Sequence, residues 1–149
     1  MAISLPSYEA GSSPDQSVPE AIGLDLAASG DLIAAVKRGL PARTFSILAE
    51  MLAVSEAYLA GVTGISPSTL MRRKRAGRLT TEESEHLLRI ARLLDLATAT
   101  FGSVADASEW LRTGNVSLGG TTPLDFADTE IGAREVEQLL GRIEYGVYS

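Results

Sequence analysis

The chain has 149 residues, with 19 acidic against 13 basic side chains and a formal net charge of −6. It contains no cysteine and only one histidine, which excludes a disulfide framework and a thiolate metal site and argues against zinc. With 45% hydrophobic residues, it is long enough to form one ordinary domain or two small ones. We therefore expect no metal and no cofactor, and the lack of cysteine suits a reducing cytoplasm.

The first part of the chain carries no signal for export or membrane insertion. Residues 1–20 contain neither a basic cluster nor a long apolar run, so a secretory signal is not expected. No eighteen apolar residues follow one another, so no membrane span is expected either. Proline, glycine and serine interrupt any periodicity there, and residues 1–25 are predicted to form a flexible arm.

Positive charge is confined to one part of an otherwise acidic chain. Residues 1–60 hold seven acidic and three basic side chains, and residues 93–149 hold nine and three. Residues 61–92 reverse this balance with three acidic and seven basic, and the densest run is residues 72–75. This distribution favours a protein that places one cationic face on DNA while its other end meets something else, although a solvated helix face is the alternative.

Helical signals follow one another along the rest of the chain, and the predicted fold class is all-α. Ser66 followed by Pro67 predicts a helix that begins with an N-cap and a proline, and Thr80 with Glu83 forms a capping box. Two more boxes are expected at Ser103-Asp106 and Thr122-Asp125. The expected helices cover residues 31–38, a segment with Pro41 in its first turn, 56–62, 67–76, 81–101, 107–111, a very short one opened by Thr122, and 133–144.

Apolar residues at i, i+3, i+4 and i+7 predict which helix faces are buried. Strand-like alternation is almost absent, so these positions are assigned to a helical core. They are Phe45, Leu48, Ala49 and Leu52 in one helix, Leu87, Ile90, Ala91, Leu94 and Ala97 in the longest, and Val136, Leu139, Leu140 and Ile143 in the last.

Residues 56–75 have the spacing of a helix-turn-helix motif. The motif needs a small residue where its two helices cross, a glycine in the turn and apolar residues that pack the second helix back. One position departs from the pattern, because Arg73 stands where an apolar residue is usual. The residues at the other motif positions are Ala60, Gly64, Ile65 and Leu70.

The second helix of such a motif lies in the major groove and reads base edges with its N-terminal half. Arg72 is the expected bidentate contact to a guanine, while Arg73, Lys74 and Arg78 are expected to meet phosphates. A structural helical hairpin with a basic exterior is the competing interpretation. The candidate groove residues are Ser66, Ser68, Thr69, Met71, Arg72 and Arg75.

The last third of the chain lacks the groups that catalysis needs. It has no Ser/His/Asp set, and Gly119-Gly120 is too short to cradle a phosphate, so an enzyme is the weakest hypothesis. Trp110 is either a core residue or a contact residue. Tyr145 and Tyr148 are expected to dock on a partner, because aromatic side chains near a chain end are seldom kept otherwise.

Several segments resemble antitoxins of the Xre/MbcA/ParS type over residues 30–149. They are ISPSTLMRRKRAGRLTTEESEHLLRIARL from Ile65, WL at Trp110, NVSLGGTTPLD from Asn115 and GAREVEQLLGRIEYGV from Gly132. The resemblance implies an all-α protein with a helix-turn-helix domain, expected at 26–101, and a toxin-binding domain, expected at 102–149. It also implies a neighbouring RES-type toxin that consumes NAD, whose active site the antitoxin blocks, and repression of the shared promoter on double-stranded DNA.

The toxin-binding part of the family pattern maps onto the last third of the chain. Trp110 is added to it as a further candidate contact. The matching residues are Asn115, Leu118, Gly119, Gly120, Pro123, Leu124, Arg142, Glu144, Tyr145 and Gly146.

The acidic end of the chain suggests how a toxin would be blocked. Substrates of RES-type toxins carry phosphate, so the toxin pocket is expected to be electropositive and to attract this segment. We hypothesise that Glu144, Tyr145, Tyr148 and the carboxylate of Ser149 occupy or cover the pocket entrance. The protein is expected to be a homodimer that matches a palindromic operator, joined through helix 81–101 or the last helix.

Two alternatives stay open on the sequence alone. The first is a stand-alone transcriptional regulator whose C-terminal part senses a ligand or a partner. The second is an interaction protein that has lost DNA binding. Co-purification of a larger toxin separates the first from an antitoxin, and the loss of promoter occupancy on substituting Arg72 and Arg75 separates the second.

Overall fold

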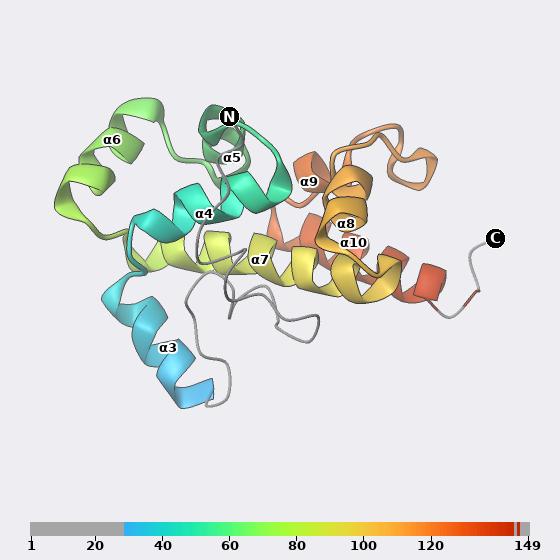
Figure 1. Ribbon diagram of the computed structural model, residues 1–149, viewed down its shortest axis with the longest axis horizontal. Helices are drawn as coiled ribbons and strands as arrows, with labels where there is room; N and C mark the ends of the chain where they lie inside the picture. Colours follow the sequence, from blue (N-terminus) through green and yellow to red (C-terminus); the bar gives the residue numbers. More distant parts are fainter. Residues whose placement is uncertain (1–28, 145, 147–149) are drawn as a thin grey trace.

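The computed structural model describes residues 29–144 and residue 146 (Figure 1). Apart from one isolated bridge, every regular element in these residues is helical, which confirms the predicted all-α class. The expected N-terminal arm and Tyr145, Tyr148 and Ser149 lie outside the described residues. The elements are α3 (Ser29–Arg38), α4 (Arg43–Leu52), α5 (Glu56–Thr63), α6 (Pro67–Ala76), α7 (Thr81–Phe101), α8 (Val104–Leu111), the 3-10 turn η1 (Val116–Leu118), α9 (Pro123–Phe126) and α10 (Glu130–Glu144).

The long helix α7 forms the axis of the molecule. In Figure 1, α4, α5 and α6 lie above its first half, while α8, α9 and α10 gather at its other end. Helix α7 packs against α8 and α10, and α4 packs against α8, so one continuous core joins the two ends. The predicted stripe of α7 is buried, including Leu87, Leu94 and Ala97. Among the described helices none is by itself long and apolar enough to cross a membrane, and only the pair α4 and α5, bent by 106°, passes that test together.

The predicted caps fix most of the helix boundaries. The Thr80 hydroxyl accepts from the Glu83 amide at 3.1 Å, and the Thr80 amide donates to the Glu83 carboxylate at 2.9 Å, which completes the capping box. At Ser55, Ser66, Ser103 and Thr122 the side-chain oxygen accepts from the amide three residues on. These hydrogen bonds satisfy amides that the first helical turn leaves free.

Five boundaries differ from the prediction, and two of them differ by one or two residues, because α3 begins at Ser29 and α5 ends at Thr63. Pro41 lies before α4 instead of in its first turn, and its carbonyl accepts the Thr44 amide at 3.0 Å and the Thr44 hydroxyl at 2.6 Å. Helix α8 begins at Val104, directly after its cap, and α10 begins at Glu130, three residues before the predicted start. The turn η1 was not expected, because it is a single 3-10 turn without apolar periodicity.

A short backbone junction fixes the end of α6 and the start of α7. The Leu79 amide donates to the Leu40 carbonyl at 2.9 Å, and the Leu40 amide donates to the Ser84 hydroxyl at 2.8 Å. Gly39 has φ +88°, and a Cβ there would lie 2.0 Å from the Leu79 carbonyl oxygen. Only glycine suits both the left-handed conformation and this close approach.

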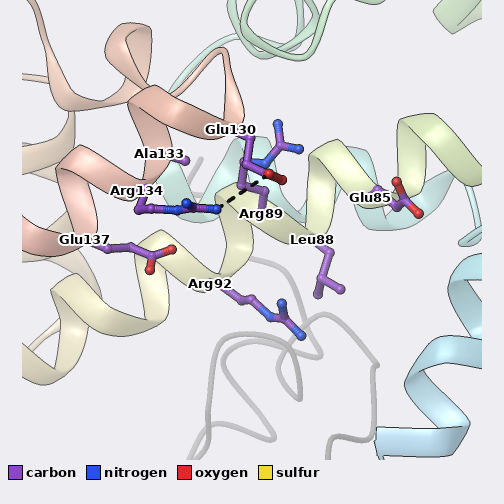
Figure 2. A pocket seen from close by; sticks show the side chains of 8 residues that line it. All are labelled: Glu85, Leu88, Arg89, Arg92, Glu130, Ala133, Arg134 and Glu137. Atoms are coloured by element: carbon purple, nitrogen blue, oxygen red, sulfur yellow. Dashed lines mark ion pairs between the residues drawn. The ribbon is translucent and has the colours of Figure 1, made fainter.

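A groove of about 390 Å³ runs between α7 and the first half of α10 (Figure 2). Leu88 and Ala133 are the apolar residues of its lining. Its remaining residues are charged, and the pair Arg134–Glu130 at 3.7 Å is exposed to solvent. The charged residues are Glu85, Arg89 and Arg92 from α7 and Glu130, Arg134 and Glu137 from α10.

Candidate functional site

Helices α5 and α6 form the predicted helix-turn-helix. Gly64 ends α5 in the left-handed conformation with φ 75°, and the Ile65 amide donates to the Ala60 carbonyl at 2.8 Å. Ala60, Ile65 and Leu70 are buried. The motif positions inferred from the spacing are therefore confirmed as the packing residues of the helix pair.

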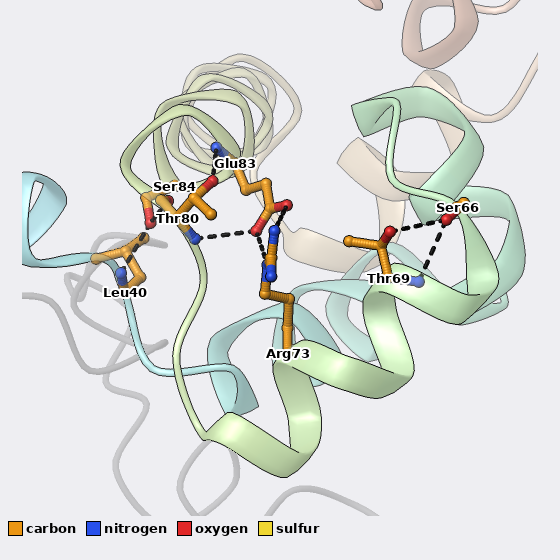
Figure 3. A network of polar contacts seen from close by, with 7 residues as sticks. All are labelled: Leu40, Ser66, Thr69, Arg73, Thr80, Glu83 and Ser84. Atoms are coloured by element: carbon orange, nitrogen blue, oxygen red, sulfur yellow. Dashed lines mark hydrogen bonds and ion pairs between the residues drawn. The ribbon is translucent and has the colours of Figure 1, made fainter.

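One face of α6 is left open to solvent. Ser68, Met71, Arg72 and Arg75 recur at i, i+3, i+4 and i+7 and are all exposed, and we call them the α6 stripe. The two other candidate groove residues are engaged with each other, because the Ser66 hydroxyl donates to the Thr69 hydroxyl at 2.9 Å and accepts the Thr69 amide at 3.2 Å (Figure 3). The hydroxyls of Ser66 and Ser68 lie 3.3 Å apart, so Met71, Arg72 and Arg75 are the stripe residues that are free to enter a DNA groove.

The basic residue at the usually apolar motif position has an internal partner. The Arg73 guanidinium donates to both carboxylate oxygens of Glu83, at 2.8 and 3.1 Å, which joins α6 to the first turn of α7 (Figure 3). Burial raises the pKa of the Glu83 carboxyl, but the hydrogen bonds from Arg73 and Thr80 outweigh burial and leave it lowered. Glu83 in turn raises the pKa of Arg73. A planar, bidentate ion pair therefore replaces the apolar contact of the motif.

The other basic residues near α6 divide into paired and free groups. Lys74 forms an ion pair with Glu56 on α5, and Arg78 donates to the Gly39 carbonyl at 2.7 Å. The pKa of Glu56 is raised by burial and lowered by the hydrogen bonds from Lys74 and Ser46, with a net decrease. Arg72 and Arg75 make no ion pair or hydrogen bond with the rest of the described chain. All three residues predicted to meet phosphates are thus engaged within the protein, while the two cations of the stripe are free.

The single histidine, His86, contacts the backbone at the end of α5. The Nδ1 atom of His86 on α7 lies 3.0 Å from the carbonyl oxygen of Thr63, the last residue of α5. A carbonyl at the end of a helix has no partner within the helix, so this contact satisfies it. His86 therefore holds the helix-turn-helix against the long helix. Among the described residues, no three acidic or histidine side chains converge in a way that could hold a metal ion.

The segment NVSLGG forms a closed loop around η1. The Asn115 side-chain oxygen accepts from the Ser117 amide at 2.9 Å, and the Asn115 carbonyl accepts from the Gly120 amide at 2.9 Å. Leu118 is buried under the loop, while Gly119 and Gly120 both have positive φ. These residues shape the loop, which explains why asparagine, leucine and two glycines occur at this spacing.

The predicted toxin-binding residues fall into three structural groups. Leu118, Pro123 and Leu124 are buried and contribute to the core. Trp110 is half-buried against Phe101, with ring centroids 5.4 Å apart. The exposed or partly exposed members within the described residues are Asn115, Gly119, Gly120, Arg142, Glu144 and Gly146.

One apolar residue of this segment, outside the predicted contact residues, is exposed to solvent. Val116 at the tip of the η1 loop is 92% exposed. No sequence signal marked its exposure, because a single 3-10 turn has no apolar periodicity from which burial could be inferred.

A polar contact joins the helix-turn-helix to the segment after η1. The Tyr58 hydroxyl on α5 donates to the Asp125 carboxylate on α9 at 2.5 Å and lies 3.5 Å from the Thr122 hydroxyl. Burial and then the hydrogen bond to Asp125 raise the pKa of Tyr58. The contact lies beside a groove of about 410 Å³ whose lining includes Asp128.

Comparisons with known proteins cover both halves of the chain. Residues 31–92 match the antitoxin Xre-like helix-turn-helix domain, and residues 96–146 match the antitoxin Xre/MbcA/ParS C-terminal toxin-binding domain. The antitoxin Xre of Yersinia enterocolitica is 35% identical over 130 residues, which cover 86% of this chain and 88% of that protein. The antitoxin Xre of Photorhabdus laumondii is 29% identical over 100% of both chains. A Sphingobium protein called Prs ADP-ribosylating antitoxin is 27% identical over 80% of this chain and 81% of its own length.

The two matched regions meet inside α7, between residues 92 and 96. The long helix therefore carries the helix-turn-helix at one end and the toxin-binding domain at the other. The order of the domains, the all-helical fold and the near full-length relatives agree with one another. The chain belongs to the Xre/MbcA/ParS-type antitoxin family.

Proposed function

We propose that this protein neutralises a toxin through its C-terminal domain and represses its own operon through the α6 stripe. The observation that carries the proposal is the stripe itself, an exposed row with two unpaired arginines on a capped second helix of a helix-turn-helix. In the same chain, a domain of the toxin-binding family occupies the other end of α7. The two activities would then use different surfaces.

On DNA, Arg72 is the proposed bidentate contact to a guanine and Arg75 its neighbour on the same helix face. Lys74 is the proposed phosphate contact, because an exposed ion pair is weak and can be exchanged for a phosphate. Arg73 is assigned a positioning role, since its guanidinium is already held in a bidentate pair by Glu83.

The salt dependence of DNA binding tests these assignments. A fluorescent duplex that covers the promoter upstream of the chain's own gene would be titrated at several salt concentrations. We expect Lys74→Gln to lower the slope of log K against log salt by about 1 per bound chain without changing sequence preference. An unchanged slope would contradict the phosphate contact, and no binding by the unaltered protein would contradict the DNA-binding function.

The proposed partner is a RES-type toxin that consumes NAD. Two observations support it: the resemblance of the C-terminal motifs to antitoxins of such toxins, and a relative whose name refers to ADP-ribosylation. Transfer of ADP-ribose takes it from NAD, whose phosphates call for a cationic pocket. The strongly acidic residues 93–149 are complementary to such a pocket.

Neutralisation is proposed to be steric. Glu144 is exposed in the last turn of α10, and the segment 145–149 follows it directly. This segment, with Tyr145, Tyr148 and Ser149, would cover the toxin's active-site entrance without any chemistry of its own.

Deletion of residues 145–149 tests this mechanism in cells that express the protein encoded by the neighbouring gene. We expect the shortened antitoxin still to purify with the toxin while cellular NAD falls and growth stops. Full protection by the shortened protein would show that these residues do not block the site. A toxin that leaves NAD unchanged when expressed alone would contradict the proposed toxin class.

The groove between α7 and α10 is the proposed dimer surface. Its lining is mostly charged, with three arginine and three glutamate residues beside Leu88 and Ala133, so ion pairs with a second copy related by two-fold symmetry are available to it. Charge reversal with Arg89→Glu and Arg92→Glu is expected to give a monomer in light scattering, whereas Arg112→Glu at the C-cap of α8 serves as the control. A dimer that survives the double reversal would place the interface elsewhere.

A further inference from the structure

We infer that Val116 is an apolar anchor of the toxin-binding domain and inserts into an apolar socket on the toxin. The inference rests on the proposed function and adds to it a contact residue outside the segment 145–149. It also names the chemistry of a second surface on the toxin, a neutral, apolar recess separate from the cationic active-site pocket.

The first observation is that an apolar side chain, which forms no hydrogen bonds with water, is exposed to solvent. Val116 is 92% exposed, more than the 78% of Ile131, the 56% of Ile33 and Met71 or the 44% of Leu96. A single exposed apolar side chain is common on protein surfaces and is not informative alone. The structure of the loop around Val116 makes its exposure informative.

The second observation is that the loop holds Val116 in one position. The backbone on either side is closed by hydrogen bonds from the Asn115 amide to the Thr121 carbonyl at 3.1 Å and from the Gly120 amide to the Asn115 carbonyl at 2.9 Å. A Cβ at Gly114 would lie 2.6 Å from the Gly120 carbonyl oxygen, so the two sides of the loop are in close contact. The loop is therefore ordered before any partner arrives.

The third observation concerns how the loop is anchored. Leu118 is buried at 8% exposure, two residues after Val116, so the turn directs one apolar side chain into the core and the other outward. The residues that match the family motif, Asn115 and Leu118, thus hold the backbone on either side of Val116 in place. An ordered loop loses little conformational entropy on binding, so an apolar contact at its tip contributes nearly its full value.

The location of the loop points to the toxin as the occupant. Val116 lies within residues 96–146, which match the toxin-binding domain, and far along the chain from the α6 stripe. Gly119 and Gly120 follow it on the exposed side of the loop and allow a partner's surface to approach the backbone closely.

The test compares three substitutions at this position by titration against the purified product of the neighbouring gene. Val116→Ala is expected to weaken binding about 15-fold, because the burial of two methyl groups is lost. The isosteric Val116→Thr is expected to weaken it about 10-fold, because one buried methyl group is replaced by a hydroxyl. Val116→Asp is expected to weaken it at least about 50-fold, since a buried carboxylate lacks a partner. All three should keep the melting temperature of the unaltered protein, because the side chain makes no core contact.

Ile131→Asp is the matched control. It places the same charge at a 78% exposed position of the same domain, and we expect less than about a threefold change in affinity. If attraction between the acidic domain and a cationic toxin were the whole interaction, both aspartates would strengthen binding.

The possible outcomes separate the inference from the function on which it rests. Loss of binding at Val116→Asp with binding kept at Ile131→Asp supports the anchor. Equal binding by Val116→Asp and the unaltered protein, or equal losses at both positions, overturns it. If the unaltered protein does not bind the toxin at all, the proposed function itself fails.

Discussion

The helix α6 and the η1 loop use the same local devices but present opposite chemistry. Each begins at a side-chain cap, Ser66 or Asn115, and each ends at a glycine in the left-handed conformation. Helix α6 then exposes arginines, whereas the loop exposes a valine. The comparison teaches that caps and glycines determine the position and the ends of a segment. The side chains that face the solvent then determine the class of partner, which is a polyanion for α6 and an apolar protein surface for the loop.

The two regions also differ in how they use charge. Around α6, Arg73 and Lys74 are paired with Glu83 and Glu56, so that the cations nearest the core are neutralised and only the stripe is free. In the C-terminal domain, acidic residues predominate, and among its described residues the most exposed large apolar side chain lies on the loop.

The largest expected effect separates the two surfaces directly. Replacing Arg72 and Arg75 together by alanine should weaken promoter binding about 100-fold or more, because each guanidinium contact to a base contributes about 1–3 kcal/mol. Toxin binding should be unchanged. Fluorescence anisotropy for DNA and calorimetry for the toxin measure both, and retained DNA affinity would remove α6 from the interface.

A substitution inside the C-terminal domain should have the next largest effect, on stability. A Cβ at Gly132 would lie 1.8 Å from the Phe126 carbonyl oxygen, so Gly132→Ala forces α9 and α10 apart and should lower the free energy of unfolding by about 3 kcal/mol. Gly141 lies on the same helix, and a Cβ there would meet no atom within 4 Å beyond the neighbouring backbone of that helix, so Gly141→Ala should raise the free energy of unfolding by about 0.5–1 kcal/mol. Urea titrations check both, and a single transition is expected because one core joins the domains.

The contact between the two regions should make a smaller contribution. Tyr58→Phe removes the hydroxyl that donates to Asp125 and should cost about 1 kcal/mol of unfolding free energy. Asp125→Asn, which can still accept that hydrogen bond, should cost less. Equal stability of the Tyr58→Phe variant and the unaltered protein would show that the contact does not couple the regions.

The smallest expected effect is a pH dependence that arises from the α6–α7 ion pair. Because the pKa of Glu83 is lowered in the folded protein, its contribution to stability is present above the ordinary glutamate pKa and is lost as pH falls through the folded value. Glu83→Gln can keep the capping box but not the charge, so its stability should fall less between pH 7 and about pH 3. Identical pH profiles for the two proteins would mean that the pair contributes nothing to stability.

Local signals in the sequence account for most of the fold. Caps at Ser55, Ser66 and Thr80 and the left-handed glycines at 64, 77 and 102 predict the helix-turn-helix and the long helix, because each acts within one turn. Features that depend on distant contacts could not be predicted in the same way. Pro41 is displaced from α4 by its bridge to Arg78, and the partner of Arg73 lies on another helix.

The site was only partly predictable for the same reason. The motif spacing placed Arg72 and Arg75 on one face of a helix, and the structure leaves both free. The family pattern, in contrast, does not distinguish residues that are buried and stabilise the fold from residues that contact a partner. Leu118 and Leu124 match the pattern because they pack, whereas Val116 lies among the pattern residues and is exposed.

Hydrogen exchange of the antitoxin, alone and in complex with the neighbouring toxin or with promoter DNA, tests the separation of surfaces most directly. The account predicts that the toxin slows amide exchange in residues 112–122 and at the end of α10 and leaves residues 66–78 unchanged. DNA should slow exchange in residues 66–78 alone. Protection of residues 66–78 by the toxin, with residues 112–144 exchanging as in the free protein, would contradict it.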